Sequence, residues 1–502
     1  MTLWPEPEWP AGLPIGEDWV HAPDSAEVRF PFTGELVSPA PVGSESLARQ
    51  AISFAAGLRE QVGDLPSHVR RSALTEAARV IAARREEFES LLVLETGKPL
   101  VDCRVEVDRT LLTLVTASEE VARLHGETVP LDLLPSGEGL MGFWVRKPIG
   151  VVVGIAGYNY PLLLASHKLA PALAAGCPVV IKPAPQTPLA TLWLVHVVRE
   201  ALAAVGAPRG AVQLVTGGAE VGVALTTDRR VGAVSFTGSA AVGHQIARDA
   251  APTKVLLELG SNSALVVAED ADVEAAADAV VRGGYYASGQ ACISVQRVLV
   301  VQAVRDRFLE ALSDRLGQVL VGDPRSPETR VSALIDDRST ARVSEWVGHA
   351  VEAGATLVVG GTVDGRVMQP TVLLDVPEGQ LAWDEEVFGP VVAVRSVPTF
   401  EDAVRAVNAS RYGLHASVFT ASLELAFKAI DRIEAGGVVV NEVPGFRSDV
   451  MPYGGVKDSG VGREGPRFAI EELTVTRMAI IRPSTRPVRP VRPARPTRRH
   501  DS

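Results

Sequence analysis

Short apolar runs alternate with helical stretches from Val145 onwards, and this alternation limits the fold more than any other feature of the sequence. The first four runs cover residues 151–155, 179–181, 212–215 and 233–236, and a helical stretch follows each of them. Strands that alternate with helices form a parallel sheet with helices on both faces. Similar runs recur at residues 264–267, 298–301, 357–359 and 391–397. We therefore expect an α/β protein with two lobes, which agrees with a length of 502 residues, because one domain typically holds roughly 100–200 residues.

The chain before Val145 has a different pattern. Residues 45–125 have helical character, with apolar positions at helical spacing between Leu74 and Leu94. Residues 126–144 read as two extended segments separated by turn residues at 135–137. A helical layer followed by a β-hairpin is therefore expected ahead of the first α/β lobe.

The chain has three cysteines, at Cys103, Cys177 and Cys292. This odd and sparse set does not form a disulfide framework, and it lacks the paired spacing of a zinc site, so no metal is expected. The pattern favours a reducing, cytoplasmic location. A cysteine with a chemical role is then more readily a nucleophile, although the simplest interpretation of each is a small buried apolar residue.

Charge is unevenly distributed along the chain. The formal net charge is −11, and residues 482–502 contain seven arginines and one aspartate, so this tail carries +6 and the remainder −17. An acidic body argues against nucleic acid as a partner. We expect a disordered Arg/Pro-rich tail over residues 483–502, the alternative being a segment that contacts an anionic surface.

We expect neither a signal peptide nor a membrane span. The first 20 residues contain four carboxylates and no long apolar run. Residues 148–166 lack charge over 19 positions, which is long enough to span a bilayer. The glycines, Asn159 and Pro161 within this stretch instead favour a buried strand, a tight turn and the start of a helix.

Several short motifs contain residues that could take part in catalysis or ligand binding. In chain order they are GYNYP (157–161), IKPAPQTP (181–188), FTGSAAVG (236–243), LELGSNS (257–263), SGQACIS (288–294), EEVFGP (385–390) and MPYGGVKDSGVGREG (451–465). Gly238 and Gly243 flank a strand-to-helix turn, with Ser239 as a natural N-cap, and such a turn can bind a phosphate. The alternative is a helix cap in which glycine serves close packing. Lys182 ends a strand and faces either the ligand crevice of a parallel sheet or solvent.

Cys292 and Glu258 are the candidates for covalent and acid–base chemistry. A thiolate nucleophile needs nearby N–H groups or a cation to lower its pKa. Glu258 lies between Leu257 and Leu259 at a strand end, where partial desolvation would suit a general base. Taken alone, each residue also fits a structural role.

The ordered set of motifs resembles the NAD(P)-dependent aldehyde dehydrogenase superfamily. The resemblance extends from about residue 13 to residue 481, with 99 residues from Asn159 to Glu258 and 34 from Glu258 to Cys292. It implies two Rossmann-type α/β lobes plus a small β oligomerisation element. The implied parts are a cofactor-binding domain (1–125 and 148–258), a catalytic domain (259–473) and the oligomerisation element (126–147 and 474–482).

The resemblance also implies the roles of individual residues. Cys292 matches the nucleophile, Asn159 the amide that stabilises the oxyanion together with the Cys292 N–H, and Glu258 the base that hydrolyses a thioester. The residues that match cofactor-binding positions are Lys182, Pro185, Gly238, Ser239, Gly243, Glu386 and Phe388. A homodimer or homotetramer is implied by the same resemblance.

Some positions depart from the family pattern. Pro185 occupies the place of a glutamate found in many NAD-preferring members, so either NAD or NADP is expected as cofactor. Val475 replaces a glutamate that in some relatives joins the lysine matching Lys168 in a proton path. The LGSNS form resembles the branch that acts on lactaldehyde, glyceraldehyde and phosphonate- or sulfonate-bearing aldehydes.

The expected substrate is a small hydroxylated or anionic aldehyde. Arg109 and Arg447 match segments that line the substrate entrance, where two guanidinium groups could grip an anionic group. The alternative is that one or both form surface ion pairs. A coenzyme A-acylating enzyme, a non-catalytic scaffold and a binding protein built around the tail remain competing functions, and Glu258 argues against the acylating one.

Overall fold

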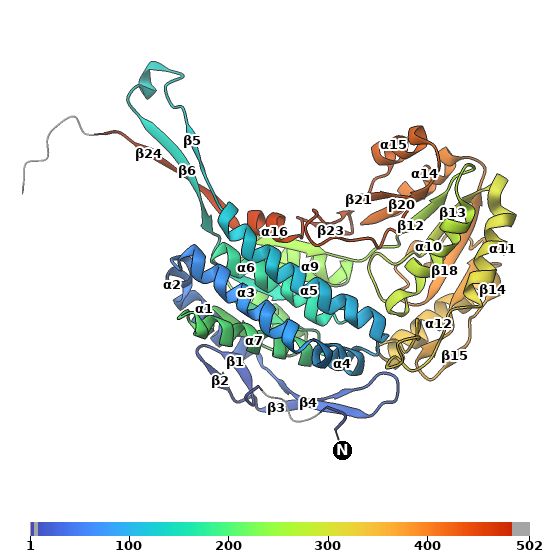
Figure 1. The fold of residues 1–502 in the computed structure, drawn as a ribbon, viewed down its shortest axis with the longest axis horizontal. Helices are drawn as coiled ribbons and strands as arrows, with labels where there is room; N and C mark the ends of the chain where they lie inside the picture. The colour runs from blue at the N-terminus through green and yellow to red at the C-terminus, as the bar shows by residue number, and fades with distance from the viewer. Residues whose placement is uncertain (1, 5–8, 484–502) are drawn as a thin grey trace, which may run out of the picture.

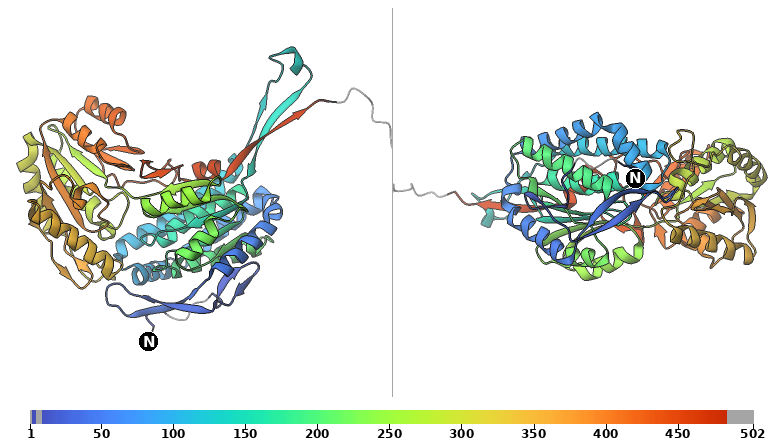
Figure 2. Two further views of the ribbon diagram at one scale, coloured as in Figure 1. Left: turned by 180° about the vertical axis from the view of Figure 1, so that it is seen from behind. Right: turned by 90° about the horizontal axis from the view of Figure 1, so that it is seen from below.

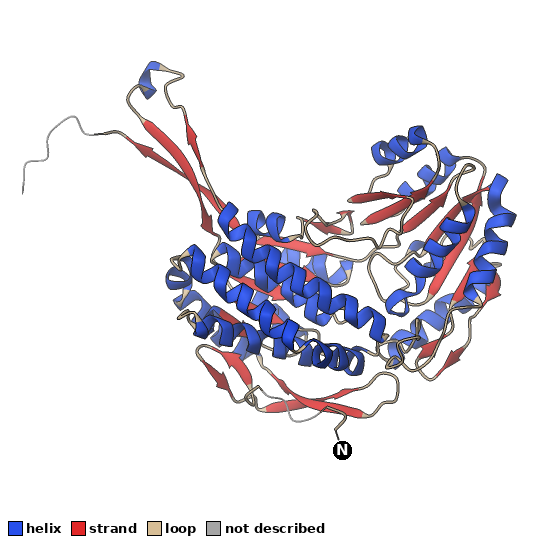
Figure 3. Ribbon diagram, viewed as in Figure 1, coloured by secondary structure: helices blue, strands red, loops and turns tan. Residues whose placement is uncertain are grey.

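Two α/β lobes and a projecting three-stranded sheet make up the computed structural model, which describes residues 2–4 and 9–483 (Figure 1). Within these residues, a six-stranded sheet forms the centre of the first lobe and a seven-stranded sheet that of the second. Helices cover both sides of the first sheet (Figures 2 and 3). The expected α/β class with two lobes is confirmed.

The first sheet has the strand order β23-β11-β10-β7-β8-β9, and its neighbours pair in parallel except β23, which is antiparallel to β11. Its strands are β7 (Val151–Ile155), β8 (Val179–Lys182), β9 (Val212–Leu214), β10 (Val231–Thr237), β11 (Lys254–Glu258) and β23 (Gly460–Val461). β7, β8 and β9 are buried along their whole length. This burial explains why they read as continuous apolar runs rather than as alternating ones.

Helices pack around this sheet. They are α1 (Glu45–Gly57), α2 (Arg59–Gly63), α3 (Ser67–Ala83), α4 (Arg85–Thr96), α5 (Leu100–Glu120), α6 (Pro161–Ala175), α7 (Leu189–Ala204), α8 (Ala219–Thr226), α9 (Ala240–Ala250) and α16 (Pro466–Glu472). α6 begins with Pro161, whose fixed φ suits a first helical position, and ends at Gly176, which adopts φ 82°. All its residues are buried, so the charge-free stretch is a core strand, turn and helix, as expected.

The second sheet has the order β14-β17-β18-β13-β12-β20-β21. Its strands are β12 (Ala264–Val267), β13 (Arg297–Val301), β14 (Thr356–Val359), β17 (Thr371–Leu374), β18 (Val391–Val397), β20 (His415–Phe419) and β21 (Gly437–Val440). Its helices are α10 (Val273–Tyr285), α11 (Arg305–Leu316), α12 (Asp337–Glu352), α13 (Leu381–Asp384), α14 (Phe400–Asn408) and α15 (Leu423–Arg432). β14 departs from the expected pattern of buried strands. It is an exposed edge strand, antiparallel to β17.

The expected hairpin projects away from both lobes (Figures 1 and 2). β5 (Glu127–Val129) and β6 (Met141–Pro148) are joined through a 3₁₀ turn, η2 (Pro135–Gly137). β24 (Thr474–Ile481) pairs antiparallel with β6 along its whole length. The sheet order β24-β6-β5 leaves β24 with one free edge.

Short elements complete the described chain. They are β1 (Leu13–Ile15), β2 (Asp18–Val20), β3 (Asp24–Arg29), β4 (Leu36–Val42), β15 (Val363–Asp364), β16 (Val367–Met368), β19 (Tyr412–Gly413), β22 (Val456–Lys457), η1 (Val121–Arg123), η3 (Arg209–Ala211), η4 (Tyr286–Gly289) and η5 (Gln302–Val304). The antiparallel pairs β1–β2 and β3–β4 precede the helical layer, where the sequence pattern predicted no strands.

One segment lies in a different lobe from the one expected. Residues 460–472 fall in the stretch assigned to the catalytic domain, yet β23 pairs with β11 and α16 packs on α6. Hydrogen bonding to the first sheet therefore places this segment in the first lobe. In the described part of the chain, no helix combines the length and the apolar character needed to cross a membrane. From residue 484 onwards, the expected tail lies outside the described residues.

Candidate active site

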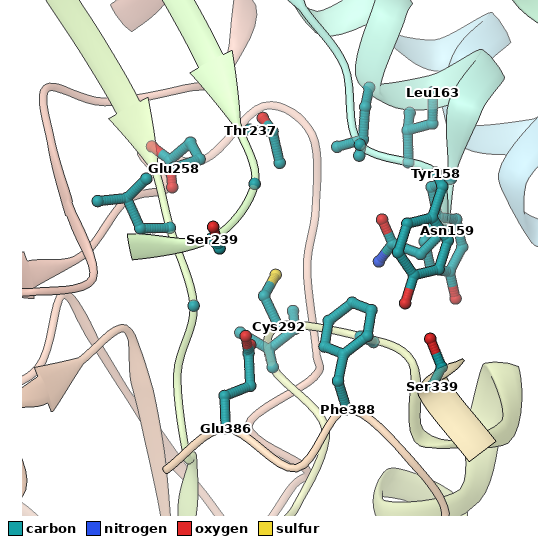
Figure 4. Close-up of a pocket in the computed structure, with 18 of the residues that line it drawn as sticks. Tyr158, Asn159, Leu163, Thr237, Ser239, Glu258, Cys292, Ser339, Glu386 and Phe388 are labelled. Carbon is teal, nitrogen blue, oxygen red and sulfur yellow. The ribbon is translucent and has the colours of Figure 1, made fainter. Parts of the chain in front are cut away.

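A cavity of about 580 Å³ lies between the two lobes, at the carboxyl ends of β7, β10 and β11 (Figure 4). Predicted residues that line it are Arg109, Asn159, Gly238, Ser239, Glu258, Cys292, Glu386, Phe388 and Arg447. Lys182, Pro185 and Gly243 are outside this lining. The cavity is where a parallel sheet is expected to bind its ligands.

A strained turn leads into the loop that carries Cys292. Ala287, Ser288 and Gly289 adopt φ values of 48°, 55° and 72°, a left-handed conformation that costs a non-glycine residue about 1 kcal/mol or more. Asp102 accepts a hydrogen bond from the Ala287 N–H at 2.9 Å. The turn also packs closely against the loop at Gly389, because a Cβ at Gly289 would come within 2.1 Å of the Gly389 carbonyl oxygen. Asp102, which the sequence analysis missed, therefore links α5 of the first lobe to this turn.

Cys292 is partly buried, and its thiol has one described side-chain hydrogen bond. Burial raises the pKa of this thiol to about 11, and a hydrogen bond with the Tyr453 hydroxyl opposes that rise. The sulfur–oxygen distance is 3.2 Å. Cys103 and Cys177 are free and fully buried, which confirms their interpretation as packing residues.

Asn159 faces the same cavity from the turn before α6 (Figure 4). Its side-chain amide donates to the Gln290 carbonyl oxygen at 2.8 Å. Its own backbone carbonyl accepts from Lys98 at 2.8 Å. The amide nitrogen thus contacts the loop that carries Cys292, in a position where an oxyanion formed at Cys292 could compete for the donor.

Glu258 ends β11 and is 6% exposed. Burial raises the pKa of its carboxyl group well above the usual value, and the neighbouring Glu464 raises it further. One of its oxygens, Oε2, has no hydrogen-bond partner among the described residues. The other lies against Gly454, where a Cβ would approach Oε1 to 2.9 Å. A buried carboxyl group with a raised pKa is suited to accept a proton near neutral pH.

Glu386 is a polar residue of the second lobe that lines the cavity. Its Oε1 accepts the Ser261 N–H at 2.9 Å, and burial raises its pKa to about 7. Gly260 permits this approach, because a Cβ there would come within 2.5 Å of Oε2. Phe388 packs edge-on against Tyr158 at a centroid distance of 5.8 Å, so aromatic groups from both lobes meet across the cavity.

The predicted phosphate turn is partly corrected. Ser239 occupies the N-cap position of α9, but its side chain makes no capping hydrogen bond and instead lines the cavity with Gly238. Gly243 is a packing glycine, since a Cβ there would come within 2.3 Å of Leu259 Cδ2. The alternative of close helix–strand packing therefore holds for Gly243, while Gly238 and Ser239 stay available to a ligand.

Lys182 ends β8 and is buried, whereas Pro185 in the following loop is exposed. Burial lowers the pKa of the Lys182 ammonium to about 8, an effect that Glu220 opposes. Its described hydrogen bond, to the Pro183 carbonyl, is 3.3 Å long. A buried ammonium with so little compensation fits a polar ligand group such as the ribose of a dinucleotide.

Arg109 and Arg447 form ion pairs, but these pairs are buried rather than on the surface. Arg109 binds both oxygens of Asp449, at 2.8 and 2.9 Å. Arg447 binds Glu464 at 3.0 Å and lies 3.4 Å from Asp449. His167 completes the cluster, with its ring nitrogens 3.0 Å from Asp449 and 3.2 Å from Glu464. The sequence analysis missed both Asp449 and His167.

Lys168 has a carboxylate partner although position 475 carries a valine. Lys168 bonds Glu464 at 3.2 Å and the Thr237 hydroxyl at 2.7 Å. Val475 instead lies on the exposed β24 strand, opposite Lys147. Position 475 is therefore an exposed place on the projecting sheet, and Glu464 supplies the carboxylate for Lys168.

Comparisons with known proteins point to one family. The model of the aldehyde dehydrogenase family matches residues 19–479. The chain is 39% identical to 3-sulfolactaldehyde dehydrogenase of Priestia aryabhattai, over 94% of this chain and 98% of the relative. Aldehyde dehydrogenase 21 of Physcomitrella patens, solved with the reaction product succinate, aligns with a TM-score of 0.90 and 33% identity, covering 94% and 98% of the two chains.

A second similar structure was solved with a cofactor bound. Glyceraldehyde-3-phosphate dehydrogenase GapN of Methanocaldococcus jannaschii, complexed with NADP, aligns with a TM-score of 0.88 and 33% identity, covering 92% of this chain and all of that one. A family model that spans nearly the whole chain, together with these relatives, establishes the family. This chain belongs to the aldehyde dehydrogenase family and is an NAD(P)-dependent oxidoreductase that acts on aldehydes.

Proposed function

We propose that the substrate is a small aldehyde with an anionic group, which is oxidised to the acid through a thioester on Cys292. The observation that supports this choice is the charge balance of an ion-pair cluster at the cavity. Its cations are Arg109 and Arg447, which line the cavity, and Lys168, which is buried behind the lining. An unbalanced buried cation is costly, so a site with excess positive charge favours an anionic ligand.

The carboxylates neutralise only part of this charge. Asp449 and Glu464 both have pKa values below the usual range, although burial opposes the shifts. His167 and Arg109 lower the pKa of Asp449. Lys168 and His167 lower the pKa of Glu464. Glu258 has a pKa raised well above its usual value by burial, which favours its neutral form. Three cations against two ionised carboxylates leave one positive charge, before His167 is counted.

The distances fit a short substrate. Arg447 lies over the face of Tyr453, with Cζ 3.7 Å from the ring centroid, and the hydroxyl of the same ring contacts Cys292. Only one aromatic ring therefore separates the nucleophile from the guanidinium group. An aldehyde with its anionic group a few carbon atoms away would span this gap.

The chemistry follows from the groups around Cys292. Its thiolate attacks the aldehyde carbon to form a thiohemiacetal. The amide of Asn159 and the N–H of Cys292 stabilise the oxyanion, and one such donor is typically worth about 3–4 kcal/mol. After oxidation leaves a thioester on Cys292, Glu258 in its ionised form takes a proton from the attacking water and the acid is released.

The first lobe supplies most of the proposed cofactor contacts. A nicotinamide cofactor, when bound, would supply the hydride acceptor that this oxidation needs. Lys182 binds the adenosine ribose, Gly238 and Ser239 hold the pyrophosphate at the N-terminus of α9, and Glu386 with Phe388 positions the nicotinamide ribose. Pro185 leaves both NAD and NADP acceptable, because no carboxylate at that position repels a 2′-phosphate.

The similar proteins support an anionic substrate. Their names and ligands include 3-sulfolactaldehyde, succinate and glyceraldehyde-3-phosphate, which bear a sulfonate, carboxylates and a phosphate. These three anions differ in geometry, but all are acceptors for guanidinium donors.

A panel of aldehydes tests the proposed function. Carboxylate-, sulfonate- and phosphate-bearing aldehydes are assayed beside neutral aldehydes of equal chain length, with NAD and NADP separately and with Cys292→Ala as blank. We expect kcat/KM to favour the anionic members by about tenfold or more, the effect of roughly 1.4 kcal/mol. Equal values for charged and neutral members would contradict the proposed substrate class.

Arg447→Gln provides a second test. The ratio of kcat/KM for anionic over neutral aldehydes should collapse towards one, because the guanidinium charge is lost. Arg282→Gln is the matched control, since Arg282 forms an exposed ion pair with Glu442 on the second lobe. An unchanged ratio in Arg447→Gln would contradict the proposal that Arg447 binds the substrate anion, whatever happens to the absolute rates.

Two competing functions are separated by product analysis. A coenzyme A-acylating enzyme would form a thioester of coenzyme A and need no Glu258, whereas the proposed enzyme forms the free acid with or without coenzyme A. A scaffold would turn over none of the aldehydes. A binding protein built around the arginine tail would lose its function on truncation at Pro483, whereas the proposed enzyme would keep its activity.

We further propose a homodimer or homotetramer assembled through the projecting sheet, in the cytoplasm. Apolar side chains on this sheet are exposed, including Leu133 at 85%, Leu134 at 68% and Ile480 at 60%. The free edges of β24 and β21 offer backbone groups for pairing with another copy. The three free cysteines support a reducing location.

A further inference from the structure

Tyr453 contacts the nucleophile directly, although neither its sequence motif nor the proposed mechanism gives it a role. Its hydroxyl lies 3.2 Å from the Cys292 sulfur, and the residue is 2% exposed. Ile293, Leu414 and Met451 surround the pair with apolar side chains. Apolar side chains therefore shield part of the hydroxyl–sulfur contact from water, and a hydrogen bond to a charged atom is stronger in such surroundings.

The ring of Tyr453 is held on several sides. Its backbone N–H and carbonyl pair with those of Glu464, at 3.1 and 2.6 Å. His415 packs edge-on against it at a centroid distance of 5.1 Å, and the Nδ1 of that histidine is 2.9 Å from the Pro444 carbonyl. A side chain fixed in this way positions its hydroxyl before any substrate arrives, so little rearrangement is needed on reaction.

The direction of the hydrogen bond depends on the state of the sulfur. When Cys292 is a thiol, either group can donate. When Cys292 is a thiolate, the sulfur has no proton, and only the Tyr453 hydroxyl can donate. Burial raises the pKa of Tyr453 well above its usual value, so the phenol keeps its proton over the working pH range.

Arg447 strengthens this donor. Its guanidinium carbon lies 3.7 Å from the Tyr453 ring centroid, the geometry of a cation–π contact. A cation over the ring face draws electron density from the phenol and polarises its O–H bond. The same arginine thus assists the donor and, under the proposed function, binds the substrate anion.

We propose that Tyr453 is a catalytic residue whose hydroxyl donates a hydrogen bond to the Cys292 thiolate and stabilises it for attack. The proposal rests on the assignment of Cys292 as the nucleophile. The other titratable groups around this sulfur are Glu258, Tyr286, Glu386 and Arg447. Of these, the carboxylates disfavour the thiolate when they are ionised, whereas the Tyr453 donor and Arg447 favour it.

Alkylation of the enzyme without aldehyde tests the proposal. The rate of Cys292 labelling by iodoacetamide is followed against pH in the wild type and in Tyr453→Phe, which removes one oxygen and keeps the ring. We expect the midpoint of the profile to rise by about one pH unit, and the rate below the midpoint to fall about tenfold. The kcat/KM for the best aldehyde should fall by about the same factor or more.

Matched variants make the result decisive. Tyr285→Phe removes another buried phenol hydroxyl, which bonds the Thr371 carbonyl, and should leave the alkylation profile unchanged. A merely structural role for Tyr453 would lower thermal stability without moving the midpoint, and that outcome overturns the proposal. Equal labelling of Cys292→Ala would instead overturn the assignment of the nucleophile. Ultraviolet absorbance of the thiolate gives the same midpoint without a labelling reagent.

Discussion

Asp449 holds Arg109 in a two-point ion pair, at 2.8 and 2.9 Å, although the two residues are 340 positions apart in the sequence. Arg109 lies on α5 of the first lobe, and Asp449 lies in the loop that follows β21 of the second. The carboxylate also contacts His167 at 3.0 Å and is 1% exposed. The pair therefore joins the lobes and fixes the guanidinium group of Arg109 in the wall of the cavity.

Asp449→Asn should both destabilise the protein and strengthen anion binding. The substitution removes a buried charge and leaves Arg109 and Arg447 less compensated, and breaking such a pair typically costs about 3–5 kcal/mol. We expect a lower melting temperature, together with tighter competitive inhibition by sulfate. Asp228→Asn is the control, because Asp228 forms an ion pair with Arg230 away from the cavity. Weaker sulfate inhibition in Asp449→Asn would refute the charge-balance argument.

Glu258→Gln should separate the two halves of the reaction. The substitution keeps the shape of the side chain but removes the base, so thioester formation continues while hydrolysis stops. Rapid mixing should show a burst of reduced cofactor of about one equivalent, followed by a steady rate reduced by roughly 10²–10⁴-fold. If the burst disappears as well, Glu258 acts before the thioester and its proposed role is wrong.

The fold was more predictable from the sequence than the site. β7, β8 and β9 are buried on both faces, so their apolar runs identify them without any long-range information. The apolar run at residues 357–359 also identified a strand, although β14 is an exposed edge strand.

The ordered motifs located Cys292, Glu258 and Asn159, and the structure brings all three to one cavity. Local sequence does not reveal partners distant in the chain, which explains why Asp449 and Asp102 were missed. Gly243 illustrates a related limit of local sequence. A glycine that makes room for Leu259 looks, in sequence, like a glycine that faces a phosphate.

Pro185→Glu should make the enzyme discriminate against NADP. Pro185 lies in the exposed loop after Lys182. A carboxylate there would repel the 2′-phosphate of NADP but would not repel the ribose hydroxyl groups of NAD. We expect kcat/KM for NADP to fall by about tenfold or more, with the value for NAD nearly unchanged, since like charges in contact cost several kcal/mol. Pro185→Gln keeps similar bulk without the charge and serves as control. A parallel loss with both cofactors would mean that the loop was distorted.

Ile480→Lys should weaken self-association. Ile480 lies on β24, is 60% exposed, and would be covered by another copy in the proposed oligomer. A lysine on an edge strand discourages edge-to-edge pairing and places a charge in an apolar interface. Leu357→Lys makes the same kind of change on β14, an edge strand of the second sheet, and should leave the oligomer intact. Light scattering during size-exclusion chromatography should show a lower mass for Ile480→Lys alone; equal masses for both variants and the wild type would argue against assembly through the projecting sheet.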